Sequence, residues 1–311
     1  MQYENSADGT ESQAPDTMNR VEGWILSKIG QRNLGKQSSR VVRALAGSPQ
    51  YASSATVADF ARRVGVDPAT VMRSAKLLGC NGWTDLQQEL RAMFLSDLDA
   101  NDLLEIHSEH EGSVIDAALL SDVVTMNNLR KSLDPEACRR FALNLIHGTH
   151  DGPDTLAKIL LYGSGSYLGP LTQFAHVGAR LGLTTVPVGW GGKAAHTAMS
   201  SATVGDVILI MNFWRTPAEF EAIAKVAKTR GLRVMLISDT RFSHLTPFID
   251  DMLVIPAEGS SHFPSLVAAS ALIHVLLALI TEELDGLGVD SIRAHDEIYF
   301  ALEDARAKKA P

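Results

Sequence analysis

Five short apolar runs, four of them separated by helical patterns, constrain the fold of this chain more than any other feature. They occupy residues 158–163, 184–189, 206–213, 233–238 and 251–256. The runs contain few alternating polar positions, which is typical of strands in a sheet covered on both faces. A loop or a short helix is expected between the fourth and fifth runs. The sequence therefore predicts an α/β unit with a doubly wound, five-stranded parallel sheet.

In such a sheet, ligands bind beyond the carboxyl ends of the strands. The first strand run leads into Gly-Ser-Gly-Ser-Tyr-Leu-Gly at residues 163–169. Gly165 lets the backbone approach an anion closely, and Ser164 and Ser166 supply hydroxyls ahead of a helix N-terminus. The third glycine comes one residue too late for a dinucleotide fingerprint, and no acid ends the second run. We therefore expect an anion site here rather than a nucleotide cofactor, or simply a tightly packed turn.

The loop after the third run begins with Asn212 and carries a cation beside the start of a helix. Thr216, Pro217 and Glu219 read as a capping box with proline at the first helical position. A cation such as Arg215 is unfavourable at a helix N-terminus by itself, but it is favourable if an anion binds between them. After the fifth run, Ser260 and Ser261 are either helix caps or phosphate-binding hydroxyls.

The front of the chain has the opposite charge to the rest. Residues 18–95 hold 11 Lys and Arg against 5 Asp and Glu, whereas the whole chain of 311 residues has a net charge of −8. A basic front on an acidic body is expected if the front alone meets a polyanion. The sequence thus predicts a DNA-binding unit in residues 18–95.

Two short amphipathic helices around a tight turn lie inside this basic front. The first has Phe60 and Ala61 on one face, is capped by Ser54 or Thr56, and ends at Gly65. Asp67 caps the second helix, and proline occupies its first position. The link of about three residues suits a helix-turn-helix crossing.

On the second helix, Val71, Ala75 and Leu78 share the inner face. The outer side is then expected to carry Ala69, Thr70, Arg73 and Lys76. An arginine on the outer side can donate two hydrogen bonds to the edge of a guanine, or it can bind a phosphate. A solvated helical hairpin without DNA is the alternative. The candidate DNA-contacting residues are Asp67, Ala69, Thr70, Arg73, Ser74 and Lys76.

The remaining composition narrows the class of protein. Cys80 and Cys138 have no zinc-binding spacing, so we expect a reduced, cytoplasmic protein without a structural metal site. The first 17 residues are polar and acidic and read as a disordered tail. The apolar run at residues 266–280 is short for a membrane span and is expected to be a buried core helix.

The segment SSATVADFARRVGVDPATVMRSAKLLGCNGWTDLQQEL at residues 53–90 is similar to the helix-turn-helix of RpiR-type transcriptional regulators. The body resembles an SIS (sugar isomerase) domain, a five-stranded parallel sandwich that binds phosphosugars. The resemblance implies a dimer in which a small effector changes operator binding. Ser164, Gly165 and Ser166 match the first phosphate-side loop, where Tyr167 replaces a frequent serine. The second loop corresponds to residues 212–216, and of its usual hydroxyls only Thr216 is kept.

These observations predict five segments. Residues 1–17 are a tail, 18–95 a helix-turn-helix domain, 96–125 a helical linker, 126–290 an SIS-like effector-binding domain and 291–311 a C-terminal helix or tail. The candidate effector-binding residues are Ser164, Gly165, Ser166, Asn212, Arg215, Thr216, Ser260 and Ser261.

The predicted function is DNA-binding regulation of transcription from a pseudo-palindromic operator, in response to a phosphosugar or another small anion. A sugar-phosphate isomerase is the alternative. It would need a general base near the strand ends, and the candidates are Glu258 with His262, or the more distant His196. An isomerase would have no use for residues 18–95, so we expect no enzymatic activity.

Overall fold

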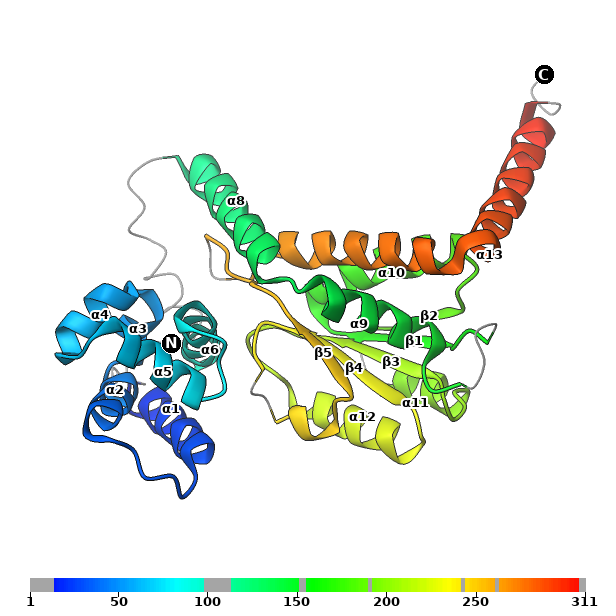
Figure 1. The fold of residues 1–311 in the computed structure, drawn as a ribbon. Coiled ribbons are helices and arrows are strands. Elements are labelled where there is room, and N and C mark those ends of the chain that lie inside the picture. The colour runs from blue at the N-terminus through cyan, green and yellow to red at the C-terminus, as the bar shows by residue number, and fades with distance from the viewer. Residues whose placement is uncertain are drawn as a thin grey trace, which may run out of the picture. The chain divides into compact units, whose positions relative to one another are not determined.

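The computed structural model describes residues 14–97, 113–150, 155–189, 192–241, 244–260 and 263–307. The chain divides into two compact units, Met1–Ser108 and Glu109–Pro311. The first is helical, and the second is a parallel sheet with helices on both faces (Figure 1).

The first unit is a small helical bundle around one apolar centre. Val21, Ile25, Leu45, Phe60 and Leu90 are all buried in it. The first helix already begins at Ala14, inside the segment that the sequence predicted as tail. The described helices of this unit are α1 (Ala14–Ile29), α2 (Lys36–Gly47), α3 (Pro49–Ser54), α4 (Val57–Val64), α5 (Pro68–Leu77) and α6 (Trp83–Asp97).

The second unit contains all five predicted strands, and every pairing between them is parallel. Their order in the sheet is β2-β1-β3-β4-β5. The central strands β1 and β3 are buried along their whole length, as expected for uninterrupted apolar runs covered on both faces. The strands are β1 (Ile159–Gly163), β2 (Thr185–Gly189), β3 (Val207–Met211), β4 (Arg233–Ser238) and β5 (Asp251–Val254).

Helices cover both faces of this sheet. The described ones are α8 (Val114–Ser132), α9 (Pro135–His147), α10 (Leu168–Arg180), α11 (Gly192–Ser200), α12 (Ala218–Thr229) and α13 (Val267–Ala307), with the 3-10 turns η1 (Gly165–Tyr167) and η2 (Thr246–Phe248). The η2 turn lies between the fourth and fifth strands, where a loop or a short helix was expected.

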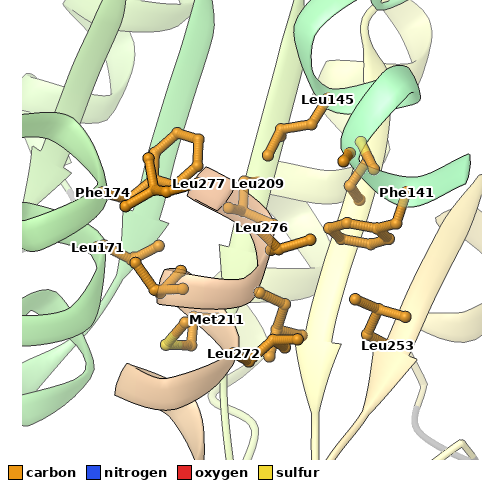
Figure 2. Close-up of a cluster of buried hydrophobic side chains, with 14 of the residues drawn as sticks. Phe141, Leu145, Leu171, Phe174, Leu209, Met211, Leu253, Leu272, Leu276 and Leu277 are labelled. Carbon is orange, nitrogen blue, oxygen red and sulfur yellow. The ribbon is translucent and has the colours of Figure 1, made fainter. Parts of the chain in front are cut away.

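One face of the sheet packs against α9, α10 and α13. Phe141, Phe174, Leu209, Leu272 and Leu276 meet there and are fully buried (Figure 2). The other face packs against α11 and α12 through a second cluster of buried side chains. Alternate residues of β1, β3 and β4 enter opposite clusters, so the sheet is the middle layer of a sandwich.

The apolar run predicted as a core helix forms the first part of α13. Val267–Asp285 is long and apolar enough to cross a membrane by length and composition alone, but Leu272, Leu276 and Ile280 are buried against the sheet. A non-helical backbone at Asp285, with φ of 40°, divides α13 into two segments. The core role predicted for this run agrees with its packing.

The linker predicted for residues 96–125 is not separate from the second unit where it is described. α8 runs across residue 125, and its Leu129 belongs to the core cluster shared with α13. Residues 98–112 lie outside the described part of the chain.

Candidate functional site

The turn between α4 and α5 is built as the sequence predicts. Thr56 caps α4 by accepting a hydrogen bond from the N–H of Asp59 at 3.1 Å. Gly65 ends the helix with φ of 70°, a left-handed conformation that favours glycine. A Cβ atom at this position would also lie 2.8 Å from Nη2 of Arg40. The left-handed backbone therefore favours glycine here, and any larger residue would also displace the end of the flexible Arg40 side chain.

Arg40, which the sequence analysis did not single out, supports this turn from outside the helix pair. Its Nη1 donates to the carbonyl of Gly65 at 3.2 Å. The two residues are 25 positions apart, so no local pattern identifies the contact. A guanidinium here satisfies a helix-terminal carbonyl and adds positive charge beside the turn.

The first turn of α5 carries a chain of hydrogen bonds along its surface. The carboxylate of Asp67 accepts from the N–H of Thr70 at 2.8 Å and from its hydroxyl at 2.6 Å. Nη2 of Arg73 donates to the same hydroxyl at 2.7 Å. These bonds, first of all the one from the Thr70 side chain, hold the pKa of Asp67 below its ordinary value. Asp67 thus acts as the N-cap, and its carboxylate is occupied within the helix.

Two of the predicted DNA-contacting residues do not face outward. Thr70 and Ser74 are buried, and the Ser74 hydroxyl donates to the carbonyl of Thr70 at 2.9 Å. The outward placement of Thr70 was wrong, because the inner face of α5 is wide enough to include both residues beside Val71 and Ala75. Their hydroxyls serve the helix itself, so neither is presented to a ligand.

The other candidates on α5 are on the surface. Ala69, Arg73 and Lys76 are exposed, and 68% of the Arg73 side chain is accessible. The exposed face of α5 therefore presents one small residue near the helix start and two cations after it. This arrangement can approach a phosphate backbone or a base edge without a steric barrier.

Trp83 anchors the helix pair from α6. Its ring centroid lies 4.7 Å from that of Phe60, and its Nε1 donates to the carbonyl of Ala55 at 3.0 Å. Gln87 also donates to this carbonyl, at 2.7 Å. The side chains of α6 thus fix the start of α4 and hold the helix-turn-helix as one rigid piece.

In the second unit, the strand order reverses between β1 and β3, which makes the gap between their carboxyl ends a topological switch point. Ser164, Gly165 and Ser166 follow β1, and Gly165 has φ of 57°. Asn212, Arg215 and Thr216 follow β3. The sheet therefore brings the two predicted anion-binding loops to the same edge.

Tyr167 joins these two loops. Its hydroxyl donates to the carbonyl of Phe213 at 2.9 Å, and the two rings pack edge to face with centroids 5.3 Å apart. Burial, with the charge of Asp239 as a second cause, raises the pKa of Tyr167 to about 12. The residue that replaces a frequent serine in the resembled family thus supports the neighbouring loop.

Asp239, directly after β4, is a second connection and was missed by the sequence analysis. Both carboxyl oxygens lie 3.2 Å from the N–H of Trp214, which has the left-handed φ of 60°. Burial raises the pKa of Asp239 to about 7, and the charge of Glu258 contributes in the same direction. An acid immediately after a buried strand run was the available signal.

The capping box predicted at Thr216 is not formed. α12 starts one residue later than expected, with Pro217 in the N-cap position and no side-chain cap. The Thr216 hydroxyl instead accepts from Nδ2 of Asn212 at 2.8 Å. Within the described residues, Oδ1 of Asn212 is buried without a hydrogen-bond partner. This side-chain pair shapes the loop after β3, and the loop retains an unsatisfied acceptor.

The remaining candidate residues lie in the loops after β3 and β5 and on α11. Arg215 is exposed, and Ser260 is partly exposed in the loop after β5. Ser261 and His262 lie outside the described residues, so the pairing of Glu258 with His262 is not testable here. His196 is exposed on α11. Within the described ranges, no group of three or more His, Cys, Asp or Glu side chains is arranged to hold a metal ion.

A helix-turn-helix unit joined to a doubly wound sandwich is the architecture of a DNA-binding transcriptional regulator with a separate effector-type domain. The family description that matches this chain is "Helix-turn-helix domain, rpiR family", over residues 24–96. An HTH-type transcriptional regulator of Clostridium perfringens is 26% identical over 238 residues, which cover 73% of this chain and 79% of the relative. The regulator RpiR of Escherichia coli K12 is 20% identical over 233 residues, covering 74% and 75% respectively.

Two solved structures share the fold. The sugar isomerase domain of an RpiR transcription factor from Sphaerobacter thermophilus has a TM-score of 0.53 at 20% identity, covering 60% of this chain and 99% of that one. The NanR protein of Vibrio vulnificus, complexed with ManNAc-6P, has a TM-score of 0.53 at 19% identity, covering 91% and 98%. Residues 24–96 of this chain are therefore a helix-turn-helix domain of the rpiR family, and the second unit has the fold of the sugar isomerase domain in those structures.

Proposed function

We propose that this regulator reads its operator as a dimer through α5, in the cytoplasm. The observation that carries the proposal is the exposed face of α5, where Ala69, Arg73 and Lys76 face solvent within the net-positive segment of residues 18–95. Ala69 allows the helix start to approach the duplex, and Arg73 provides a fork for a guanine edge or a phosphate. Two such helices in a dimer match a pseudo-palindromic operator with half-sites about one helical turn apart, roughly 34–36 Å.

The proposed effector is a small anion with hydroxyl groups, of which a phosphosugar is the leading class. Ser164, Gly165 and Ser166 supply hydroxyls and backbone at the end of β1, and Arg215 supplies a cation after β3. The NanR structure, which holds ManNAc-6P, supports the phosphosugar class by its fold. The replacement of the usual second-loop hydroxyls by Asn212, Phe213 and Trp214 favours a ligand whose charge is met mainly by Arg215.

The unsatisfied acceptor of Asn212 is a further reason to expect a hydroxylated ligand. A buried acceptor without a partner costs about 1–3 kcal/mol. A ligand hydroxyl that reaches this oxygen after a small rearrangement of the loop would recover that cost. The ligand would thereby favour one arrangement of the loop after β3, which is the differential binding that regulation requires.

The isomerase alternative has weaker support. Asp239 has a pKa suited to a general base, but it is buried and both of its oxygens face the N–H of Trp214. A base must reach the proton that it removes, so this geometry favours a role in positioning the loop. The relatives from Clostridium perfringens and Escherichia coli are named as regulators, which supports the same conclusion.

Two measurements test the proposal separately. Selection of bound duplexes from a random-sequence library at low ionic strength should yield an enriched pseudo-palindrome. Failure to retain duplex DNA of any sequence, with or without added metabolites, would contradict the DNA-binding part.

Thermal unfolding in the presence of ManNAc-6P, other sugar phosphates, inorganic phosphate and small carboxylic acids should identify the effector class. A ligand that binds the native protein at 100 times its Kd stabilises it by about 2.7 kcal/mol. A shift with phosphosugars but not with inorganic phosphate would support the sugar-specific site. If carboxylic acids alone raise the unfolding temperature, the phosphosugar class is wrong.

A further inference from the structure

Helix α8 has two apolar faces, and only one of them is covered. On the covered side, Leu129 is buried in the core with α13. On the other side, large aliphatic side chains remain 56–71% exposed. These exposed side chains, which we call the outer face of α8, are Ile115, Leu119, Leu120, Val123 and Val124.

A single apolar stripe is the usual pattern for a surface helix, and a second one indicates a second contact. At about 100° per residue, Val123 lies roughly opposite Thr125 and Leu129, which are buried. The first turns of α8 project beyond the sandwich in Figure 1. Val204 and Val226, on other elements of the same unit, are exposed and isolated from one another in sequence. A second group of exposed apolar side chains lies on the last part of α13, at Ile298, Tyr299, Phe300 and Leu302. The outer face of α8 is therefore a concentrated apolar surface.

The charges along this face are arranged symmetrically about its centre. Asp116, Val123 and Arg130 are seven residues apart, so they lie nearly in line along the helix. Asp116 is in the first turn, and Arg130 and Lys131 are in the last turn; all three are exposed. The helix runs from 114 to 132, so Val123 is also its midpoint.

We propose that the outer face of α8 binds the same face of α8 in a second copy of the chain, in antiparallel orientation about a twofold axis at Val123. Such an axis brings Asp116 opposite Arg130 of the partner subunit, and Arg130 opposite the partner subunit's Asp116. Val123 meets its own symmetry mate, with Leu119 and Leu120 beside it. The same surface on both subunits is then self-complementary, as an isologous contact requires.

The charge pattern selects this occupant and this orientation. A parallel pair would place Asp116 against Asp116 and the basic last turns against each other, and like charges repel at such distances. A helix of 19 residues is about 28 Å long, so the antiparallel pair provides a contact of that length for each subunit. A helix from the chain's own first unit is the competing occupant, and it would leave the protein monomeric.

The inner side of the same helix holds the loop that follows β5. The Thr125 hydroxyl donates to the carbonyl of Glu258 at 3.1 Å, and the Ser265 hydroxyl donates to Asp122 at 2.6 Å. Ser260, a candidate effector residue, lies between these two anchors in the sequence. The contact therefore specifies the interface of the dimer on which the proposed function rests, and it connects that interface to the effector loop.

Disulfide trapping of the full-length chain tests the orientation. In Val123→Cys the two thiols meet at the twofold axis, so mild oxidation should give a covalent dimer. In Asp116→Cys the two thiols are about 21 Å apart along the paired helices, so no covalent dimer should form. The native Cys80 and Cys138 are buried, and Val226→Cys on α12 controls for random collisions. Trapping of both α8 variants, or of neither, would overturn the antiparallel arrangement.

Molar mass measured by light scattering at micromolar concentration tests the contact itself. Val123→Asp should convert the dimer to monomer, whereas Val226→Asp, an equally polar change at an exposed valine, should not. Asp116→Arg should weaken the dimer at least tenfold, and the double change Asp116→Arg with Arg130→Asp should restore it, since the exchanged charges pair again. Circular dichroism establishes that each variant is folded.

A monomeric wild-type protein, or a dimer that survives Val123→Asp, would overturn the proposal. So would a double charge exchange that fails to restore the dimer lost in the folded single variant. These measurements use neither DNA nor effector. A protein that dimerises through α8 but ignores DNA would contradict the proposed function alone, whereas one that binds DNA through another interface would contradict this inference alone.

Discussion

The carboxyl group of Asp239 lies 3.2 Å, at both of its oxygens, from the main-chain N–H of Trp214. Trp214 has a left-handed backbone, which costs a residue with a side chain on the order of 1 kcal/mol or more. The contact therefore stabilises a strained loop next to Arg215, the cation proposed to meet the effector. We therefore expect Asp239 to act on the proposed effector through this loop, as a positioning residue.

The raised pKa of Asp239 predicts a dependence of stability on pH. A carboxyl whose pKa rises from 3.8 to about 7 on folding stabilises the native state fully below the lower value, and this contribution is lost as the pH rises through 7. Asp239→Asn has no carboxyl group that titrates at this position, so its stability does not show this loss. The free energy of unfolding of the variant should therefore rise relative to wild type from pH 5 to pH 8, by roughly 1.4 kcal/mol for each unit of pKa difference covered.

Urea unfolding at the two pH values measures this difference. Asp290→Asn removes an exposed carboxylate from α13 of the same unit and controls for the general loss of charge. Parallel pH profiles for wild type and Asp239→Asn would show that the buried carboxyl does not titrate in this range.

The turn of the helix-turn-helix provides a stability prediction with an internal control. Gly65→Ala forces a Cβ into a left-handed conformation and against Arg40, so it should destabilise the first unit by about 1–2 kcal/mol. Gly23→Ala should instead stabilise it by about 0.5–1 kcal/mol, because Gly23 is exposed within α1 and a Cβ there meets nothing within 4 Å. Thermal unfolding of both variants measures the two opposite shifts. Equal effects of the two substitutions would contradict the requirement for glycine at the turn.

The sequence predicts the fold well because local patterns determine it. Uninterrupted apolar runs identify all five strands, and each observed strand lies inside its predicted run. Asp67 with Pro68 and Asp134 with Pro135 identify helix starts, because capping depends on neighbouring residues alone.

The site was harder to predict because its contacts cross between elements. Asp239 reaches Trp214 over 25 positions, and Arg40 reaches Gly65 over the same separation. Periodicity places a residue on a face only within the width of that face, which is why Thr70 was assigned outward although it is buried. Local sequence alone suggests that Thr216 caps α12. In the structure its hydroxyl instead accepts a hydrogen bond from Asn212.

Arg215 is expected to decide the response to effector without affecting DNA binding. Arg215→Ala should abolish the thermal shift produced by the effective ligand, since the exposed cation beside the start of α12 provides the positive charge in the proposed site. Lys225→Ala removes an exposed cation from the same helix away from the site and should respond as wild type does. Operator affinity without ligand should be unchanged in both variants. A normal thermal shift in Arg215→Ala would place the effector site elsewhere.

Arg73 is expected to dominate the contact between α5 and DNA, and two substitutions separate its possible roles. Arg73→Ala should weaken operator binding by more than about 1 kcal/mol in a titration at fixed salt. Arg73→Lys keeps the charge but loses the planar fork, so it should retain affinity if Arg73 holds a phosphate and lose discrimination if it reads guanine. Since the Arg73 guanidinium also donates to Thr70, unfolding of the free protein must be measured for both variants. Unchanged operator affinity and unchanged salt dependence in the folded Arg73→Ala protein would exclude Arg73 from the DNA interface.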